Sequence, residues 1–324
     1  MMSTNQALGI LLQIYQSLLV VALAPLLTGW VNQCRAWLQN RSGPGVMQPY
    51  RTLRKLFHKD AVMAYNASLL FRATPYIRFG CMWLAAAIIP IIAVDLPFSP
   101  AADVIALVGV FALARVFIAL AAMDIGTAFG TLGARREMLV SFLAEPALLM
   151  VFFTASMISH STQLPRIVEA LAQHQFVLYP SLAFAGLAFL IVLLAENARI
   201  PVDNPATHLE LTMIHEAMIL EYSARHLALV EWASSLKLFA YIAIGIALFL
   251  PYGIAEVGAM AGNWGSALPL AIIALLVKLI LAGAALALLE ALLAKMRIFR
   301  APEFLGTAFL LAVLGLLIHF LLGA

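Results

Sequence analysis

The sequence predicts an all-α integral membrane protein, a single domain of 324 residues built as a bundle of about eight transmembrane helices. Hydrophobic residues make up 64% of the chain and charged residues only 11%, whereas a soluble domain has roughly 45–50% apolar and about 25% charged residues. Apolar runs recur along the whole chain, with no polar stretch long enough to fold separately. A water-soluble core cannot absorb this excess, so the composition favours a bundle in a lipid bilayer.

Eight windows meet the length that a membrane span requires. A helix needs roughly 20 predominantly apolar residues to cross about 30 Å of hydrocarbon. No basic residue precedes the first window, so it is interpreted as an uncleaved helix rather than a signal peptide. The predicted spans are residues 8–30, 76–94, 101–123, 139–158, 177–195, 236–254, 267–292 and 303–323.

The distribution of basic residues predicts the orientation. Lys and Arg gather in the odd-numbered connections, whereas the even-numbered connections hold Arg166 alone. Because cytoplasmic loops are enriched in Lys and Arg, connections 31–75 and 196–235 are predicted in the cytoplasm and both termini outside the inner (cytoplasmic) membrane. The net charge of +3 therefore reflects topology and does not indicate nucleic-acid binding. Four further basic residues lie within or at the ends of spans: Arg78, Arg115, Lys237 and Lys278.

The two cysteines, Cys34 and Cys81, are too few to hold an iron–sulfur cluster. One lies in a polar connection and the other in an apolar run, so neither a CxxC pair nor four thiolates for an iron–sulfur cluster is available. We therefore expect no metal site and no cofactor held by this chain itself.

The first cytoplasmic connection predicts an amphipathic helix. Gly43-Pro44-Gly45 indicates a turn, and the stretch from Tyr50 to Lys59 spaces apolar residues at helical intervals among basic neighbours. Such a helix lies in the membrane interface. The alternative is a basic loop that only enforces topology.

The second cytoplasmic connection is unusually acidic. Its carboxylates lie beside Arg199 in a segment rich in Leu, Ile and Met. One interpretation is a solvated loop of mixed charge; the other is a proton path or a docking surface, because acids in poorly hydrated surroundings titrate near neutral pH. The acidic residues are Glu196, Asp203, Glu210, Glu216, Glu221 and Glu231.

Ionisable residues inside spans each need a partner, because a charge at the bilayer centre costs at least about 2.5–3.5 kcal/mol. Glu145 precedes Pro146, whose missing amide frees a carbonyl for water or a partner. We interpret Glu145 as part of an acid chain, the alternative being a structural pair with Arg115 or Arg135. Lys278 and Glu290 lie ~18 Å apart along one helix and cannot pair with each other. An interior role and a structural salt bridge remain equally open for Lys278.

Several short motifs occur in one order along the chain. Together they resemble subunit 1 of respiratory complex I and its homologues in membrane-bound group 4 nickel–iron hydrogenases, within which the chain is similar to hydrogenase-4 component C and formate hydrogenlyase subunit 4. The resemblance covers nearly the whole chain. The motifs are Arg41-Ser42-Gly43-Pro44-Gly45 with Gln48 and Lys55-Leu56, Gly133-Ala134-Arg135-Arg136-Glu137, Glu145-Pro146, Ala195-Glu196 with Arg199, Pro201 and Asp203, and Glu221-Tyr222-Ser223.

The resemblance implies a non-catalytic anchor that couples electron transfer to proton or sodium movement. Its expected partners are hydrogenase-like large and small subunits, iron–sulfur subunits and antiporter-like membrane subunits, which would hold the nickel–iron site and the clusters. The resemblance and the burial argument together give two groups of candidates. The ion-coupling candidates are Glu145, Glu196, Asp203, Glu210, Glu221, Arg199, Lys278 and Glu290, and the docking candidates are Arg41, Lys55, Arg135 and Arg136.

The chain departs from the quinone-reducing pattern between Pro201 and Leu211. Complex I members carry two further acids here, at the positions of Ala206 and His208. The acids associated with the quinone chamber are therefore incomplete, which argues against quinone binding. Ser42 also replaces a second arginine expected beside Arg41. The alternatives are a quinone-binding subunit of an NADH dehydrogenase-like complex and a stand-alone secondary transporter, although no inverted repeat supports the latter.

Overall fold

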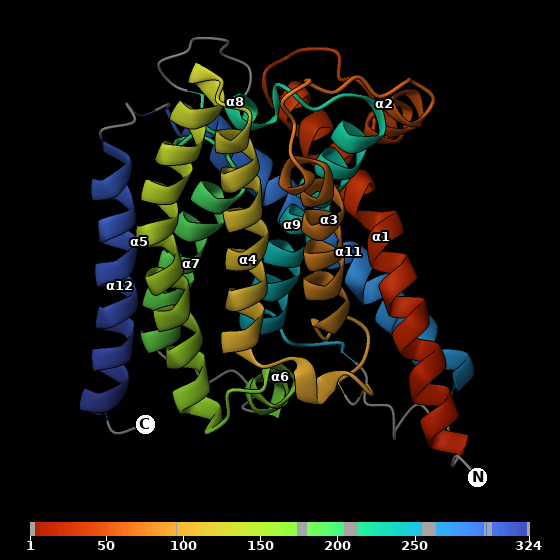
Figure 1. The fold of residues 1–324 in the computed structure, drawn as a ribbon. Helices are drawn as coiled ribbons and strands as arrows, with labels where there is room; N and C mark the ends of the chain where they lie inside the picture. The colour runs from red at the N-terminus through yellow and green to blue at the C-terminus, as the bar shows by residue number, and fades with distance from the viewer. Residues whose placement is uncertain are drawn as a thin grey trace.

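The computed structural model describes residues 4–94, 96–173, 180–203, 213–254, 264–294, 296 and 300–322. Within these residues the secondary structure is helical, apart from one isolated β-bridge between Asp103 and Gln163. The predicted all-α membrane fold is confirmed. Long helices run side by side between one end that carries α2 and α8 and an opposite end that carries α6 (Figure 1). The first turn of α1 and the last turn of α12 both lie at the α6 end.

A helix occupies each of the eight predicted windows in the described part of the chain. Six of these helices, all except α3 and α7, are long and apolar enough to cross a membrane by length and composition. Helix α7 is apolar but has 17 residues, and α3 has 20 residues that include Arg72 and Arg78. The helices are α1 (Thr4–Leu38), α3 (Leu69–Ile88), α4 (Val104–Asp124), α5 (Ala128–Ser159), α7 (Pro180–Glu196), α9 (Ala224–Phe249), α11 (Trp264–Leu292) and α12 (Ala301–Leu322).

The observed helices extend beyond the apolar windows at the end that carries α2. Helix α5 begins at Ala128 rather than at residue 139, and α9 begins at Ala224 rather than at residue 236. Apolar content measures the part of a helix that crosses hydrocarbon, whereas backbone hydrogen bonds continue the helix into its polar turns. Among the described residues the structure also contains four short elements, of which only α2 was predicted: α2 (Gln48–Phe57), the 3₁₀ turn η1 (Ser99–Ala101), α6 (Leu164–Gln173) and α8 (His215–Ile219).

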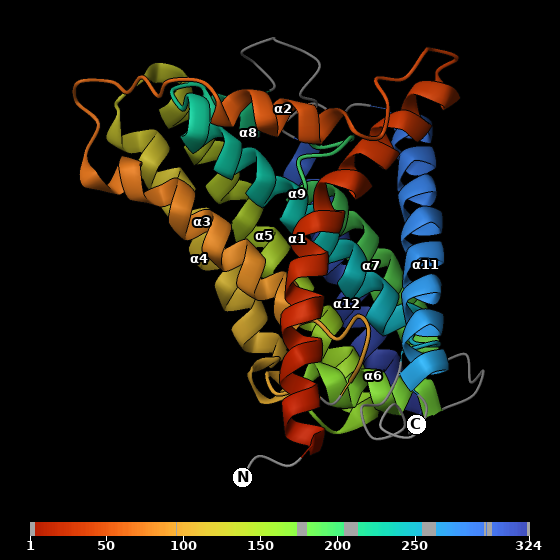
Figure 2. The same ribbon diagram turned by 90° about the vertical axis from the view of Figure 1, so that its right-hand side faces the viewer.

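Helix α2 is the amphipathic helix that the sequence predicts. It lies across the end of the bundle, beside α9 and α1 (Figure 2). Leu53 is the buried residue of this helix, and the ring of Phe57 meets the ring of Trp232 of α9 edge-on, with 6.3 Å between centroids. The predicted turn before α2 places Gly45 at φ +88°, a conformation that favours glycine, and the Gly45 amide donates to Gln33 Oε1 over 2.9 Å.

The second long connection is anchored to the bundle at two points. The short helix α8 (His215–Ile219) packs on α5, where a Cβ added to Gly133 would lie 2.8 Å from the Ile214 carbonyl oxygen. Glycine is therefore required for this close approach. Farther along, the Tyr222 ring stacks on Phe71 of α3 at 4.1 Å, and its hydroxyl donates to the Phe71 carbonyl over 3.1 Å. These contacts hold His215 and the start of α9 against the bundle.

Candidate functional site

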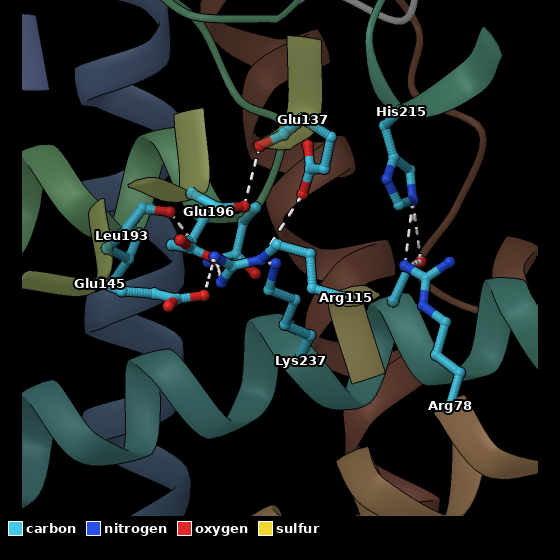
Figure 3. Close-up of polar contacts among 11 residues, drawn as sticks. Arg78, Arg115, Glu137, Glu145, Leu193, Glu196, His215 and Lys237 are labelled. Atoms are coloured by element: carbon cyan, nitrogen blue, oxygen red, sulfur yellow. Dashed lines mark hydrogen bonds and ion pairs between the residues drawn. The ribbon is translucent and has the colours of Figure 1, made fainter. Parts of the chain in front are cut away.

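Arg115 lies at the centre of a buried group of charges. It projects from the middle of α4, and its side chain is 6% exposed. Its guanidinium contacts three carboxylates: Nη1 donates to Glu145 Oε1 over 2.7 Å, Nη2 donates to Glu196 Oε2, and Nε lies 3.7 Å from Glu137 Oε1 (Figure 3). Glu137 and Glu145 belong to α5, whereas Glu196 is the last residue of α7. One arginine thus joins three helices.

Lys237 of α9 brings a second cation to the same group. Its Nζ lies 2.9 Å from Glu196 Oε2 and 6.0 Å from the centroid of the fully buried Tyr241 ring. We call Arg115, Glu137, Glu145, Glu196 and Lys237 the carboxylate cluster. It contains three carboxylates and two cations, so with every group ionised its net charge is −1. One carboxylate can therefore take up a proton without leaving a cation unpaired.

A second polar group lies around Arg78 of α3. The Arg78 Nη2 atom donates to Ser234 Oγ over 3.1 Å and lies 3.2 Å from His215 Nε2, while Asp203 Oδ2 accepts from the His215 amide over 3.1 Å. Burial, followed by the charges of Arg78 and Lys237, holds the pKa of His215 well below its usual range. His215 is therefore a neutral imidazole at pH 7.

Glu290 of α11 lies in a third group, between two arginines. Its side chain is fully buried, with Oε1 accepting from Arg199 Nη1 over 3.0 Å and Oε2 lying 3.5 Å from Arg35 Nη1. Arg35 belongs to the last turn of α1, and Arg199 follows α7. The three residues together carry a net charge of +1. The sequence predicts that Glu290 cannot pair with Lys278 and needs another partner. The structure provides two such partners on other segments.

A cavity of about 260 Å³ touches all three groups. Glu196 and Lys237 line it from the carboxylate cluster, Arg78 and His215 from the second group, and Glu290 from the third. Arg78 Nη1 and Asn197 Oδ1 also belong to lining residues, and neither atom has a hydrogen-bond partner in the described part of the chain. Polar atoms without a protein partner beside a cavity of this size ordinarily form hydrogen bonds with water. The cavity therefore forms a polar connection between α8 and the carboxylate cluster.

The structure brings some predicted coupling residues together and not others. Glu145, Glu196, Asp203, Arg199 and Glu290 belong to the three groups above. Two others lie apart from them. Glu221 is exposed in the turn before α9, and Lys278 donates to the carbonyl oxygens of Leu250, over 2.7 Å, and Tyr252, just beyond the end of α9. Glu210 lies outside the described residues. No cluster of three or more His, Cys, Asp or Glu side chains with metal-binding geometry occurs among the described residues.

The predicted docking residues all lie at the end of the bundle that carries α2 and α8. Arg41, Lys55 and Arg135 are exposed. Arg136 is half-buried, and its Nη1 donates to the Met213 carbonyl oxygen over 3.0 Å. Three of the four are therefore accessible to a partner, whereas Arg136 also holds the segment before α8 against α5.

The sequence of this chain matches the model of a known family. The sequence model described as NADH dehydrogenase matches residues 10–321 of the chain. This chain belongs to that family, the complex I subunit 1 family. The resemblance found in the short motifs is thereby confirmed.

Within the family, the chain is similar to two proteins of Escherichia coli (strain K12). It is 31% identical to formate hydrogenlyase subunit 4 over 308 residues, which cover 95% of this chain and 98% of the relative. It is 34% identical to hydrogenase-4 component C over 242 residues, covering 74% and 75%. A subunit of the NADH-quinone oxidoreductase of Rickettsia bellii (strain OSU 85-389) is 27% identical over 199 residues, covering 59% and 58%.

A solved structure of the membrane-bound sulfane sulfur reductase, an archaeal respiratory membrane complex, contains a chain with the same fold. The two chains superpose with a TM-score of 0.78 over 95% of this chain and 97% of the other, at 21% sequence identity. The family fold is therefore shown by structure as well as by sequence.

The ion-coupling candidates predicted from the sequence did not include several residues of the buried groups. These residues are Arg115, Glu137, Lys237 and the pair of Arg78 with His215. A usable signal existed for three of them, because Arg78, Arg115 and Lys237 are basic residues within or at the ends of apolar spans and such charges need buried partners. Glu137 and His215 lie in segments that read as polar connections. Only the packing of α5 and α8 against α4, and of α8 against α5, shows that both residues belong to the buried polar network.

Proposed function

We propose that this chain is the non-catalytic membrane anchor and ion-coupling subunit of a hydrogenase-like or formate hydrogenlyase-like respiratory complex. The observation that carries the proposal is the carboxylate cluster, which joins α4, α5, α7 and α9 around Arg115 and opens on a polar cavity. The similarity to formate hydrogenlyase subunit 4 and hydrogenase-4 component C supports the type of complex. The chain would act as a single membrane domain, with no redox centre of its own.

The surplus carboxylate is the basis of the coupling step. Three carboxylates share two cations, so protonation of one leaves Arg115 and Lys237 to pair with the other two. Glu145, with a side chain 32% exposed, can release its proton toward a neighbouring membrane subunit, whereas Glu196 is 2% exposed and faces the cavity side. If the charge beside Asp203 and His215 changes, the proton is expected to move to a different carboxylate of the carboxylate cluster. Arg199, Glu290, Glu210 and Glu221 remain candidates for the same path, whereas the contacts of Lys278 with the carbonyl oxygens of Leu250 and Tyr252 favour a structural role for that residue.

The end that carries α2 and α8 is proposed to lie on the cytoplasmic side of the inner membrane and to bind the soluble redox arm there. Arg41, Lys55 and Arg135 offer exposed positive charge there, and the distribution of basic residues assigns this end to the cytoplasm. The expected partners are hydrogenase-like large and small subunits, iron–sulfur subunits and antiporter-like membrane subunits. The nickel–iron site and the clusters would belong to those partners.

The proposal is tested by purifying the tagged chain in mild detergent, identifying its partners, and assaying hydrogen evolution and quinone reduction. Nickel–iron subunits that copurify with quinone-independent hydrogen evolution support the proposal. Partners that oxidise NADH together with quinone reduction would instead make the chain a quinone-binding subunit. A protein that purifies alone, and moves an ion after reconstitution, would make it a transporter.

A further inference from the structure

An apolar groove between α7, α9 and α11 adjoins the polar cavity described above. Its volume is about 410 Å³, and its lining is almost entirely carbon. Phe189 and Phe249 contribute aromatic rings, while Leu187 and Leu190 of α7 are 54% and 41% exposed along one wall. The groove is therefore open on a face that lies within the membrane-spanning part of the bundle.

The polar cavity lies one helical turn beyond the groove on each of the three helices. Leu193 of α7 lines the groove, and Asn197, the residue that follows α7, lines the cavity; on α9 the corresponding residues are Ile242 and Leu238. On α11 they are Leu286 and Glu290. Residues four apart on a helix lie on one face, about 6 Å along the axis. The groove and the cavity therefore lie end to end along the three helices, as an apolar part and a polar part.

At its edge the polar part holds a local excess of positive charge, although the cavity lining as a whole carries five carboxylates against four cations. Arg35 and Arg199 share the single carboxylate of Glu290, and the Arg35 side chain, at 30% exposure and 3.5 Å from Glu290 Oε2, is the less engaged of the two. Glu290 lies two residues before the end of α11, and Arg35 belongs to the last turn of α1. Basic residues at helix ends meet the phosphates of a bilayer. The buried Asn197 Oδ1 atom, which has no partner among the described residues, is a further open polar group beside this edge.

We infer that the groove and the arginine edge bind one glycerophospholipid, with an acyl chain in the groove and its phosphate on Arg35 and Arg199. The apolar lining accommodates hydrocarbon and the net charge of +1 on the Arg35–Glu290–Arg199 group complements an anionic phosphate. A neutral quinone ring would leave that charge uncompensated. The Asn197 Oδ1 atom accepts from a hydroxyl or ammonium group of the lipid head.

The test measures phospholipid retained by the full-length chain, purified with the partners that accompany it. After delipidating washes, the preparation is titrated with dioleoyl phosphatidylglycerol or dioleoyl phosphatidylethanolamine in detergent, and bound lipid is counted by mass spectrometry. Retention of about one lipid per chain is expected. Ala285→Phe adds a ring inside the groove and should lower lipid affinity at least about tenfold. Leu288→Phe adds the same ring on the 48% exposed face of α11, outside the groove lining, and should leave retention unchanged.

Arg35→Gln provides a second variant that leaves the groove intact, and it should also weaken retention. Preference for phosphatidylethanolamine would assign Asn197 to an ammonium group, and preference for phosphatidylglycerol would assign it to a hydroxyl. Equal retention by Ala285→Phe and Leu288→Phe overturns the inference, as does a quinone in place of phospholipid in the extract. Crosslinking of Ala285→Cys to a partner's transmembrane helix would overturn it too. None of these readouts depends on hydrogen evolution, so the result is independent of the proposed function.

Discussion

The Lys237 ammonium lies 2.9 Å from the Glu196 carboxylate and thereby joins the middle of α9 to the last residue of α7. Arg115 of α4 binds the same carboxylate oxygen. A carboxylate that is 2% exposed thus has two cationic partners on two other helices. Glu196 is therefore the position at which a change of protonation alters the packing of three helices.

Neutralising Glu196 should reduce the ion movement that accompanies each hydrogen molecule evolved. Glu196→Gln keeps the shape of the side chain but cannot exchange a proton, so ion movement per hydrogen evolved should fall about a hundredfold, the scale of a lost proton-transfer group. The measurement is ion uptake by proteoliposomes that contain the whole complex, alongside hydrogen evolution. Glu303→Gln, at an exposed position in the first turn of α12 and outside the cluster, is the matched comparison. Undiminished ion uptake in Glu196→Gln would contradict a coupling role, and loss of assembly would make the residue structural.

Removing the Arg115 cation should destabilise the fold. Arg115→Met leaves Glu137, Glu145 and Glu196 with Lys237 alone, and an uncompensated buried charge costs about 3–5 kcal/mol. Thermal unfolding in detergent would measure the loss. Arg135→Met, at an exposed position on α5, should change stability by no more than about 0.5 kcal/mol. Similar unfolding temperatures for the two variants would mean that the cluster is solvated.

His215 should make stability depend on pH below about 6.5, the pKa of histidine in the unfolded chain. Its folded pKa lies well below the unfolded value of about 6.5, so in this range the unfolded chain binds a proton that the folded chain does not. Stability is therefore present above the unfolded pKa and falls as the pH drops below it. His215→Gln should flatten this part of the pH profile of thermal unfolding, whereas His160→Gln, at an exposed position, should leave it unchanged. A profile unaltered by His215→Gln would refute the assignment.

Reversing charges at the α2 end should weaken binding of the soluble arm. Combined Arg41→Glu and Lys55→Glu substitutions place negative charge at exposed positions, so retention of the arm should fall about tenfold at low salt, with a smaller effect at high salt. Copurification at two salt concentrations would measure this. Arg166→Glu alters an exposed arginine at the opposite end of the bundle and should not affect retention. Equal retention by the double variant would restrict the first connection to setting topology.

We expect Lys278 to stabilise the fold rather than to take part in ion movement. Its ammonium binds carbonyl oxygens just beyond the end of α9, and hydrogen bonds to a charged group contribute about 1.5–3 kcal/mol. Lys278→Met should therefore lower thermal stability by that amount, while ion movement per assembled complex stays close to that of the unchanged chain. Lys278→Arg, which retains the charge, should recover part of the stability. A large loss of ion movement without loss of stability would return Lys278 to the coupling path.

Much of the fold follows from local properties of the sequence. Runs of apolar residues locate helices because the hydrocarbon accepts only backbone whose amides are paired, and this constraint acts on every span independently. The amphipathic helix α2 was predictable because Leu53 and its basic neighbours share one helical period. Boundaries were less predictable. The polar first turns of α5 and α9 gain their order from packing against α8 and α2, which no single segment records.

The sequence by itself determined the class of fold, the family and the residues that are expensive to bury, among them Glu145, Glu196 and Glu290. It could not determine partners, since a charge in a span can be satisfied by any segment that reaches it. Only the tertiary structure brought Arg115 to three carboxylates, placed Arg199 and Arg35 on Glu290, and left Lys278 at the end of α9. The physical reason is that ion pairing depends on distance across helices, and the residues of these pairs lie 22 to 255 positions apart.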